Sequence, residues 1–397
     1  MNTALTRRNL LAAALATGVA VPLGGAGRGW AVPAQAAPGQ ARLTLPPPTG
    51  PHRVGTVSLH LVDSSRPDPV AGPGHHRELM ASVWYPTARD AAARRHPLAL
   101  WMPAAPMRAL LESAGFDADT AAAPLTAGHE GAPALRTPRW LPVIVFSHGA
   151  SGHRSEATIV VQELASHGYV VVTVDHTYDA YSEFPDGRLS VPDDDLSFTP
   201  WDHAHDIRFI LDRIEDLAAG RNPDADRRPL PAGLGAALDL RRIGMFGYSK
   251  GATATALVMN QDQRVRAGVS FDGPMQSQPP VTDLDRPFML MTGEFTRAAE
   301  PSVEALWSHL HGWRLNVHAD GASHAAYCDH QWLIPQLATI TGMSDEDLAG
   351  WIGTLDPARA VRIQQAYPLA FFDLHLRHRG HLLNGPNPAF PEVRFIP

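Results

Sequence analysis

Residues 243–259 read IGMFGYSKGATATALVM, and the pentapeptide GYSKG at 247–251 lies at the centre of this stretch. The residues before the pentapeptide resemble a short apolar strand, and the small residues after it resemble the start of a helix. A G-x-S-x-G pentapeptide between a strand and a helix is typical of a sharp turn that presents its serine at the edge of a sheet. Glycine is needed on both sides because a strained turn leaves no room for Cβ atoms near the helix. We therefore expect Ser249 to be a nucleophile.

A serine nucleophile needs a histidine base, and the base needs an acid that orients it. Around such a turn the serine comes first in the chain, then the acid, then the histidine. Asp272 directly follows the apolar run 267–271, and the ends of strands are where an open α/β sheet gathers its chemistry. Asp272 is therefore the expected acid. Its alternative role is that of a turn residue before Gly273, and the other candidate acids are Asp283 and Asp285 in a later loop.

The expected base is His324, in the loop 320–324 (DGASH) that follows the last predicted strand. The chain has 20 histidines, so position must decide between them. Other histidines near this loop lie on or beside predicted helices or at the end of a strand: His309, His311, His318 and His330. Only His324 combines a flexible, glycine-containing loop with the required place in the chain order.

Backbone amides are expected to form the oxyanion hole, which stabilises the charge that develops on a carbonyl oxygen. The amide of Lys250 follows the nucleophile and supplies the first donor. The second donor is expected from Ala150, in the loop 147–152 (SHGASG) after the first buried strand. His148 in the same loop is expected to orient the loop, and a role as catalytic base is the alternative.

Lys250 is the single lysine of the chain. Its side chain has several interpretations. In the first interpretation the side chain is solvated along the first turn of the helix. In the second it favours a substrate with a negative group, and in the third it pairs with an acid of the segment 175–179 (DHTYD).

The rest of the chain alternates between strand-like and helix-like patterns. Continuous apolar runs, as expected for strands buried on both faces, cover 142–146 and 169–174. Further strands are predicted over 265–271, 287–292 and 313–317. Helices are predicted over 156–167, 201–217, 303–311, 331–341 and 357–377. Such alternation predicts an α/β fold with a mostly parallel, doubly wound sheet and helices on both faces.

The segments before the parallel pattern have a different character. Strand-like residues 54–62 and 78–85 are joined by Ser, Pro and Gly turn residues, which predicts an antiparallel hairpin at the edge of the sheet. Residues 101–138 are rich in Ala and Pro. This composition predicts irregular structure with one short helix over 107–113. Residues 101–138 are also the candidate cover for the mouth of the site, although the sequence does not decide whether they form a lid.

The amino terminus has the features of an export signal. Arg7 and Arg8 precede a moderately apolar stretch, and residues 34–36 (AQA) fit a small-x-small cleavage site. We expect a twin-arginine signal peptide over 1–36, with an ordinary secretory signal or a retained anchor as alternatives. Each of them places the chain outside the cytoplasm. Residues 37–50 are expected to be a flexible leader, and 51–397 a single catalytic domain.

Composition narrows the partners. The formal net charge of −7 disfavours nucleic acid and a charge-driven hold on anionic membranes. Cys328 is the only cysteine, so an intramolecular disulfide is excluded.

The segment 202–206 (DHAHD) resembles a metal motif, but on a helix its two histidines point about 200° apart and cannot share one ion. The acidic triplet 193–195 is expected to be a solvated loop, with a loose calcium site as the alternative. We therefore expect no metal and no cofactor.

At these residues the chain resembles the platelet-activating-factor acetylhydrolase family, within the α/β-hydrolase superfamily that includes dienelactone hydrolases and cutinase-like polyesterases. The stretches that carry the resemblance are 145–149 (VFSHG), 164–171 (LASHGYVV), 247–254, 271–273 (FDG) and 321–324 (GASH), and it spans about 50–380. It implies an α/β-hydrolase fold, with Ser249, Asp272 and His324 as triad and Ala150 and Lys250 as oxyanion donors. The chain departs from the family at Tyr248 and Lys250, where His and an apolar residue are more usual.

The expected function is that of a secreted serine carboxylic-ester hydrolase that cleaves short or medium acyl esters, phospholipid esters among them. A cutinase-like polyesterase or lipase, or a deacetylase of a secreted small molecule, is the alternative within the same chemistry. An inactive hydrolase-fold binding protein is the alternative from another class. The expected partner is thus a small-molecule or lipid ester, and the sequence sets no oligomeric state.

Overall fold

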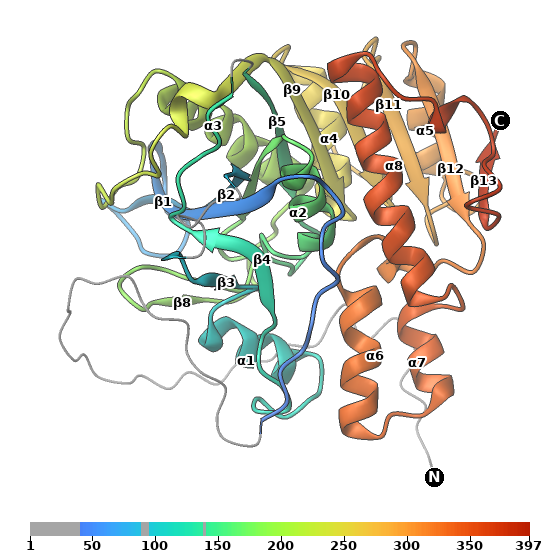
Figure 1. The fold of residues 1–397 in the computed structure, drawn as a ribbon, viewed down its shortest axis with the longest axis horizontal. Coiled ribbons are helices and arrows are strands. Elements are labelled where there is room, and N and C mark those ends of the chain that lie inside the picture. The colour runs from blue at the N-terminus through green and yellow to red at the C-terminus, as the bar shows by residue number, and fades with distance from the viewer. Residues whose placement is uncertain (1–39, 89–94, 138–139) are drawn as a thin grey trace.

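A computed structural model of the chain describes residues 40–88, 95–137 and 140–397 (Figure 1). Eleven strands of these residues form one sheet in the order β13-β12-β11-β10-β9-β5-β6-β2-β1-β4-β3. The strands of this sheet are β1 (Arg53–Pro67), β2 (His76–Thr87), β3 (Leu98–Leu100), β4 (Leu125–Glu130), β5 (Leu141–Ser147), β6 (Val170–Asp175), β9 (Leu238–Tyr248), β10 (Val265–Phe271), β11 (Phe288–Thr292), β12 (Arg314–Ala319) and β13 (Val393–Ile396). A separate two-stranded sheet joins β7 (Ser182–Glu183) and β8 (Leu189–Ser190).

The centre of the sheet is parallel. Strands β6, β5, β9, β10, β11 and β12 pair in parallel with their neighbours. Strands β5 and β6 consist of buried residues along their whole length, which is why they read as continuous apolar runs in the sequence. The predicted doubly wound α/β sheet is confirmed.

Helices cover both faces of this sheet. The helices are α1 (Ala104–Ser113), α2 (Thr158–Ser166), α3 (Pro200–Ala218), α4 (Lys250–Gln261), α5 (Pro301–His309), α6 (His330–Thr341), α7 (Asp345–Ile352) and α8 (Pro357–Arg377). Helices α3, α4 and α5 share one buried apolar cluster with the sheet. Helices α2 and α8 lie over the other face, in front of the sheet in Figure 1, and share a second cluster.

The predicted antiparallel N-terminal hairpin is confirmed, because β1 and β2 pair antiparallel from Arg53↔Thr87 onward. Its predicted place at the edge is wrong, because β4 and β3 lie beyond β1 in the sheet. The prediction for residues 101–138 is wrong in part. Helix α1 lies where the short helix was expected, but β4 adds a strand that pairs in parallel with β1. Its sequence LTAGHE gives little strand signal. Gly128 interrupts the apolar pattern because a Cβ there would come within 2.5 Å of the Trp84 ring.

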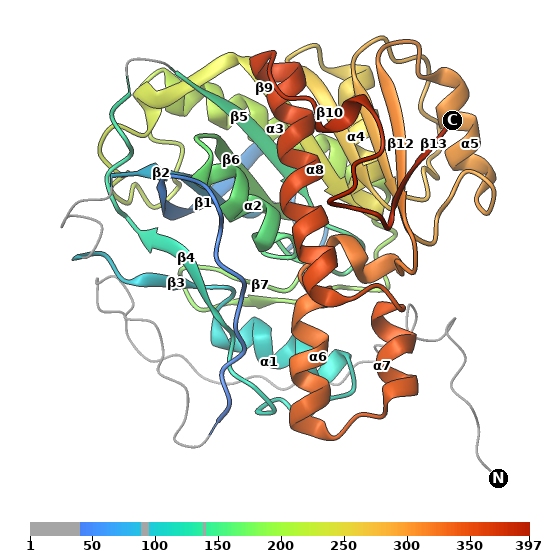
Figure 2. The same ribbon diagram turned by 45° about the vertical axis from the view of Figure 1, so that its right-hand side comes forward.

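A third layer lies beyond one end of the sheet. Helices α1, α6 and α7 lie below the strands in Figures 1 and 2 and share a third apolar cluster. The arrows of β10 and β11 point toward this layer in Figure 1. The α1–α6–α7 layer therefore lies near the carboxyl ends of the parallel strands, where the candidate site residues are placed.

Residues 40–50 do not behave as a free leader where the structure describes them. Leu43 is buried in the third cluster, and its amide donates to the carbonyl of Ala122. The amide of Thr49 donates to Glu163 Oε2 at 2.7 Å. The predicted export signal at 1–36 lies outside the described residues.

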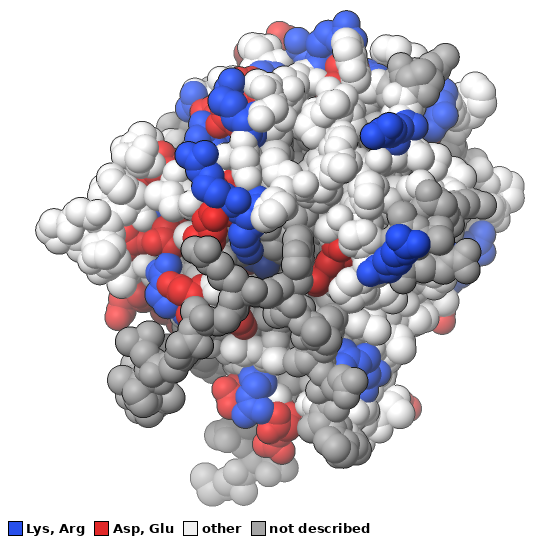
Figure 3. All heavy atoms as spheres, turned by 60° about the vertical axis from the view of Figure 1, so that its left-hand side comes forward, with Lys and Arg blue, Asp and Glu red and all other residues white. Residues whose placement is uncertain are grey.

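The face of the molecule in Figure 3 carries charges of both signs. In Figure 3 a short row of basic side chains has acidic side chains beside it, and wide uncharged areas separate the other basic groups. Within the described residues, none of the helices has the length and apolar character needed to cross a membrane.

Candidate active site

Ser249 lies in the sharp turn between β9 and α4, in a backbone conformation that non-glycine residues seldom adopt. Its φ is 53° and its ψ is −119°, and its amide donates to the carbonyl of Phe271 at 2.9 Å. A Cβ at Gly247 would lie 2.0 Å from the carbonyl oxygen of Gly251, and one at Gly251 would lie 2.1 Å from that of Ser147. Both flanking glycines are therefore required by close approach, and the surrounding structure holds Ser249 in a strained turn.

Asp272 and His324 meet beside this turn. Asp272 directly follows β10, and its buried Oδ2 lies 2.7 Å from Nδ1 of His324. Three backbone amides also donate to the Asp272 carboxylate, those of Gly293 (2.7 Å), Phe295 (2.9 Å) and Glu294 (3.1 Å). The carboxylate is thus fixed from several sides, and it engages Nδ1 of the imidazole, as the acid of a Ser-His-Asp relay does.

Aromatic rings hold the His324 imidazole next to the nucleophile turn. The ring of Tyr248 stacks on it with centroids 4.7 Å apart, and Phe295 meets it edge-on at 5.1 Å. Tyr248 directly precedes Ser249, so the imidazole lies beside the turn. Among the described residues no hydrogen bond is recorded for Ser249 Oγ. Such bonds commonly tighten only when a substrate is bound.

The loop after β5 lies against Ser249. A Cβ at Gly149 would come within 3.2 Å of the Ser249 Cβ. The Gly149 amide is engaged by Glu156 Oε2 at 2.8 Å, whereas no partner within the described residues is recorded for the amides of Ala150 and Lys250. These two amides are the expected oxyanion donors, and both remain available to a bound group.

His148 is a buried structural residue of this loop. Its Nε2 accepts the amide proton of His176 at 3.0 Å, so its Nδ1 carries the proton and donates to the Gly149 carbonyl at 2.6 Å. Burial lowers the pKa of His148 to about 4, and the neighbouring His176 acts in the same direction. His148 therefore joins the loops after β5 and β6 as a neutral imidazole. The expectation that it orients the loop is confirmed.

The Lys250 side chain forms an internal ion pair. Its Nζ donates to Asp179 Oδ2 at 2.6 Å and to the carbonyl of Phe198 at 2.9 Å. Asp179 belongs to the loop after β6, so the expected pairing with an acid of 175–179 is confirmed. The interpretation of Lys250 as a solvated side chain is wrong, because both contacts lie within the protein.

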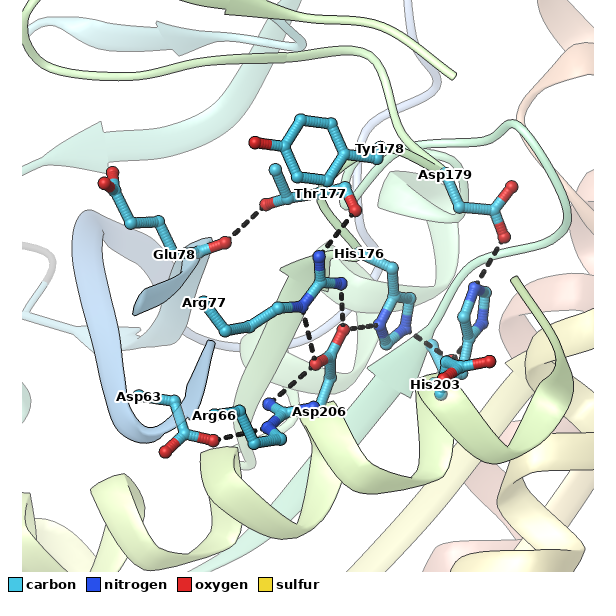
Figure 4. A network of polar contacts seen from close by, with 12 residues as sticks. Asp63, Arg66, Arg77, Glu78, His176, Thr177, Tyr178, Asp179, His203 and Asp206 are labelled. Atoms are coloured by element: carbon cyan, nitrogen blue, oxygen red, sulfur yellow. Dashed lines mark hydrogen bonds and ion pairs between the residues drawn. The ribbon is translucent and has the colours of Figure 1, made fainter. Parts of the chain in front are cut away.

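Behind this ion pair lies a buried polar network that sequence reasoning missed (Figure 4). His203 Nε2 donates to Asp179 Oδ2 at 2.8 Å, and the His203 ring stacks on that of His176 at 3.6 Å. His176 Nδ1 in turn donates to Asp206 Oδ2 at 3.0 Å, and Arg77 donates to the same oxygen at 2.7 Å. The network thus leads from the nucleophile turn to β2.

Charge is balanced inside the network. Burial alone would raise the pKa of Asp206, but the Arg77 guanidinium and the hydrogen bond from His176 hold it well below its ordinary value. Burial lowers the pKa of His176 to about 3, so His176 is neutral beside the ionised Asp206. Two signals in the sequence indicated this part of the network: the segment 202–206, which resembles a metal motif, and the apolar spacing of α3, on whose buried face His203 and Asp206 lie.

The alternative acid and histidines, and the single cysteine, have other contacts in the structure and do not join the candidate triad. Asp283 is exposed and bonds to His309 and His311 on the surface. His318 bonds to the carbonyl of Thr292, and Cys328 is buried. Within the described residues no group of three or more His, Cys, Asp or Glu side chains is arranged to hold a metal ion.

Comparison with known proteins relates the chain to esterases. The sequence model of the family described as "Platelet-activating factor acetylhydrolase, isoform II" matches residues 38–182. A curated relative from Arthroderma benhamiae, named "Probable 1-alkyl-2-acetylglycerophosphocholine esterase", is 27% identical over 380 residues, covering 89% of this chain and 93% of the relative. The platelet-activating factor acetylhydrolase of Canis lupus familiaris is 27% identical over 164 residues, which cover 35% of this chain and 36% of the relative.

The similarity extends to a solved structure. A ferulic acid esterase from Streptomyces cinnamoneus superposes with a TM-score of 0.74 at 32% sequence identity, covering 90% of this chain and 100% of that one. The family model ends before Ser249, whereas this superposition extends over most of the chain. The likeness to known esterases therefore includes the whole α/β architecture and is not confined to the amino-terminal half.

Proposed function

Because the chain belongs to the platelet-activating-factor acetylhydrolase family of α/β hydrolases and is an esterase, we propose that it cleaves carboxylic esters through an acyl-enzyme on Ser249. The observation that carries the proposal is the 2.7 Å bond between Asp272 and His324 beside a strained Ser249. The three residue types stand in the chain order that this chemistry requires.

The proposed first half-reaction is acylation. His324 Nε2 takes the proton of Ser249 Oγ as the oxygen attacks the ester carbonyl carbon, and Asp272 stabilises the resulting imidazolium. The carbonyl oxygen becomes negative, and the amides of Ala150 and Lys250 donate to it. When the intermediate collapses, the bond to the alcohol oxygen breaks and His324 gives that oxygen its proton.

The proposed second half-reaction is hydrolysis of the acyl-enzyme. A water molecule loses a proton to His324 and attacks the acyl carbon, passing through the same oxyanion hole. Collapse of this intermediate returns the proton to Ser249 Oγ and releases the carboxylic acid. The imidazole thus acts as base and then as acid in each half, which requires the tautomer that Asp272 fixes.

For the substrate we propose short acyl esters, with acetyl esters of phospholipid type as the first candidates. The naming of the Arthroderma benhamiae relative, which covers nearly the whole chain, supports this class. Ferulate esters are the second candidate, supported by the higher identity of the Streptomyces cinnamoneus esterase.

We also propose export through the twin-arginine signal at 1–36. Replacing Arg7 and Arg8 together by lysine tests it, and an undiminished exported fraction would contradict it.

Turnover of a panel of esters tests the substrate proposal. The panel contains p-nitrophenyl esters of increasing chain length, a 1-alkyl-2-acetylglycerophosphocholine and methyl ferulate, each given to the wild-type chain and to Ser249→Ala. We expect acetyl esters to have the highest kcat/KM and Ser249→Ala to lose turnover by about 10⁴-fold or more. A preference for methyl ferulate would favour the second candidate, and turnover retained by Ser249→Ala would overturn the mechanism.

A further inference from the structure

We propose that Asp179 is a positioning residue that holds the two sides of the oxyanion hole in register. The proposal rests on the serine mechanism above and deepens it. Asp179 lies in the loop after β6, with its side chain 7% exposed, and it touches neither Ser249 nor His324 in the recorded contacts. Its role would therefore be exerted through the residues that carry the two amide donors.

The two carboxylate oxygens of Asp179 bind opposite sides of the hole. Oδ1 accepts the backbone amide of Ser151 at 2.9 Å, and Ser151 follows the expected donor Ala150. Oδ2 accepts Lys250 Nζ at 2.6 Å, and the amide of Lys250 is the other expected donor. One rigid, planar group thus bridges the loop after β5 and the first turn of α4.

Asp179 is itself firmly placed. Its Oδ2 also accepts a hydrogen bond from His203 Nε2 at 2.8 Å, and its amide donates to the carbonyl of His176 at 2.8 Å. Tyr178 before it adopts a φ of 70°, which non-glycine residues seldom adopt outside constrained sites. Figure 4 shows Asp179 at one end of the buried network that continues through His203 to Asp206.

The charges of Asp179 and Lys250 must also be considered together. A carboxylate near a developing oxyanion opposes catalysis, because like charges repel in a poorly solvated site. The Lys250 ammonium lies against this carboxylate and offsets it. Loss of Lys250 alone would leave an uncompensated negative charge near the hole, whereas loss of both charges would leave none. The proposal therefore predicts that the two substitutions are not additive.

Three variants separate positioning from general structure. Asp179→Asn keeps an oxygen for the Ser151 amide but turns an NH₂ group toward Lys250. Lys250→Met removes the ammonium and keeps the length of the side chain, and the third variant combines both changes. Asp175→Asn is the matched control, because Asp175 is also buried, at the end of β6 four residues earlier, but binds Arg154 and Ser182 instead.

The readouts are kcat and KM for an acetyl ester, the Ki of a trifluoromethyl ketone and thermal unfolding. The serine oxygen adds to the carbonyl carbon of the ketone, and the carbonyl oxygen becomes an oxyanion. The affinity of the ketone therefore reports on the oxyanion hole, as that of a transition-state mimic does. We expect Asp179→Asn to lower kcat by about 10- to 100-fold with KM within about threefold, and to raise Ki in parallel. Lys250→Met should lower kcat more than the double variant does. The kcat and Ki of the control Asp175→Asn should stay within about threefold of the wild-type values.

The proposal is overturned if Asp179→Asn leaves kcat and Ki unchanged, or if Asp175→Asn loses as much as Asp179→Asn. It is also overturned if the loss falls on KM alone. If Asp179→Asn does not fold, Lys250→Met decides, and an unchanged kcat and Ki in that variant would overturn the proposal. If all three variants fold, additive losses of kcat in the cycle would contradict the charge argument. A wild-type chain that turns over no ester and is not inhibited by the ketone would instead reject the serine mechanism itself.

Discussion

The Asp272 carboxylate of the candidate triad is held by four hydrogen-bond donors. Three amides and one imidazole donate to its two oxygens, so neither the position nor the acceptor character of the carboxylate is left free. This arrangement keeps a proton on Nδ1 of His324 and leaves Nε2 to act as base. The tautomer of the imidazole is therefore set by one residue.

Replacing Asp272 by asparagine should reverse this control. The amide group of Asp272→Asn can turn its NH₂ toward Nδ1, which favours the wrong tautomer of His324 while the packing stays intact. We expect kcat to fall by about 10³- to 10⁴-fold with little change in KM, as in comparable triads. Steady-state kinetics on an acetyl ester give the answer, and a loss below about tenfold would show that Asp272 is not the orienting acid.

The sequence was enough to propose the candidate triad, but it was not enough to identify the buried polar residues around it. Ser249, Asp272 and His324 each follow a strand or stand in a loop after one, so chain order and position sufficed to select them. Asp179 was anticipated only as one of the acids of 175–179 with which Lys250 could pair, and the contacts of His176 and His203 were not anticipated. Their contacts join loops and helices that are distant in the sequence, and no local pattern specifies such pairs.

At the scale of elements, the turn between β9 and α4 is the best determined connection. Its sequence combines an apolar strand, two glycines and a small-residue helix, and each part has a visible steric reason in the structure. Strand β4 and helix α7 were missed for opposite reasons. Strand β4 is polar and is held by its pairing with β1, whereas α7 is a short and largely exposed helix.

Alanine at Gly251 should break the turn, because its Cβ would lie 2.1 Å from the Ser147 carbonyl and neither backbone can move freely. We expect Gly251→Ala to reduce the free energy of unfolding by about 1–3 kcal/mol and to lower kcat strongly. The control is Gly350→Ala in α7, where an added Cβ meets no atom within 4 Å. Alanine there should raise the free energy of unfolding by about 0.5–1 kcal/mol. Urea unfolding measures both, and equal effects would contradict the steric account.

At the scale of the whole molecule, buried titratable groups should give a stability maximum near neutral pH. Burial lowers the pKa of His148 to about 4, of His176 to about 3 and of His330 to about 4. Below about pH 6.5 the unfolded chain protonates these histidines while the folded chain does not, so stability falls as the pH falls. Each such proton contributes a slope of up to about 1.4 kcal/mol per pH unit.

Two buried acids act in the opposite direction. Burial raises the pKa of Glu156 to about 8 and that of Asp329 to about 7. Their stabilising effect is complete below their unfolded pKa values and is lost as the pH rises through 7 and 8. Between about pH 4.5 and 6.5 the three histidines make the free energy of unfolding rise with pH and the two acids make it fall, so the more numerous histidines decide the direction. Above pH 6.5 only the two acids change it, and it falls. The maximum is therefore expected near pH 6.5.

Urea unfolding at pH 5, 6.5 and 8 checks this expectation. The wild-type free energy of unfolding should be highest at pH 6.5. Glu156→Gln keeps an acceptor for the Gly149 amide but cannot ionise, so it should reduce the decline between pH 6.5 and 8. A monotonic rise to pH 8, or a decline that Glu156→Gln leaves unchanged, would contradict the assignment.

The most direct measurement of the central claim is the site at which a fluorophosphonate labels the active chain. The reagent phosphonylates a serine only when a base and an oxyanion hole activate that serine, and peptide mass mapping identifies the residue. We predict one label per chain, on Ser249, with labelling slowed by at least about 100-fold in His324→Ala. Ester turnover by the wild-type chain with labelling of another serine, or with Ser249 unlabelled, would contradict the account.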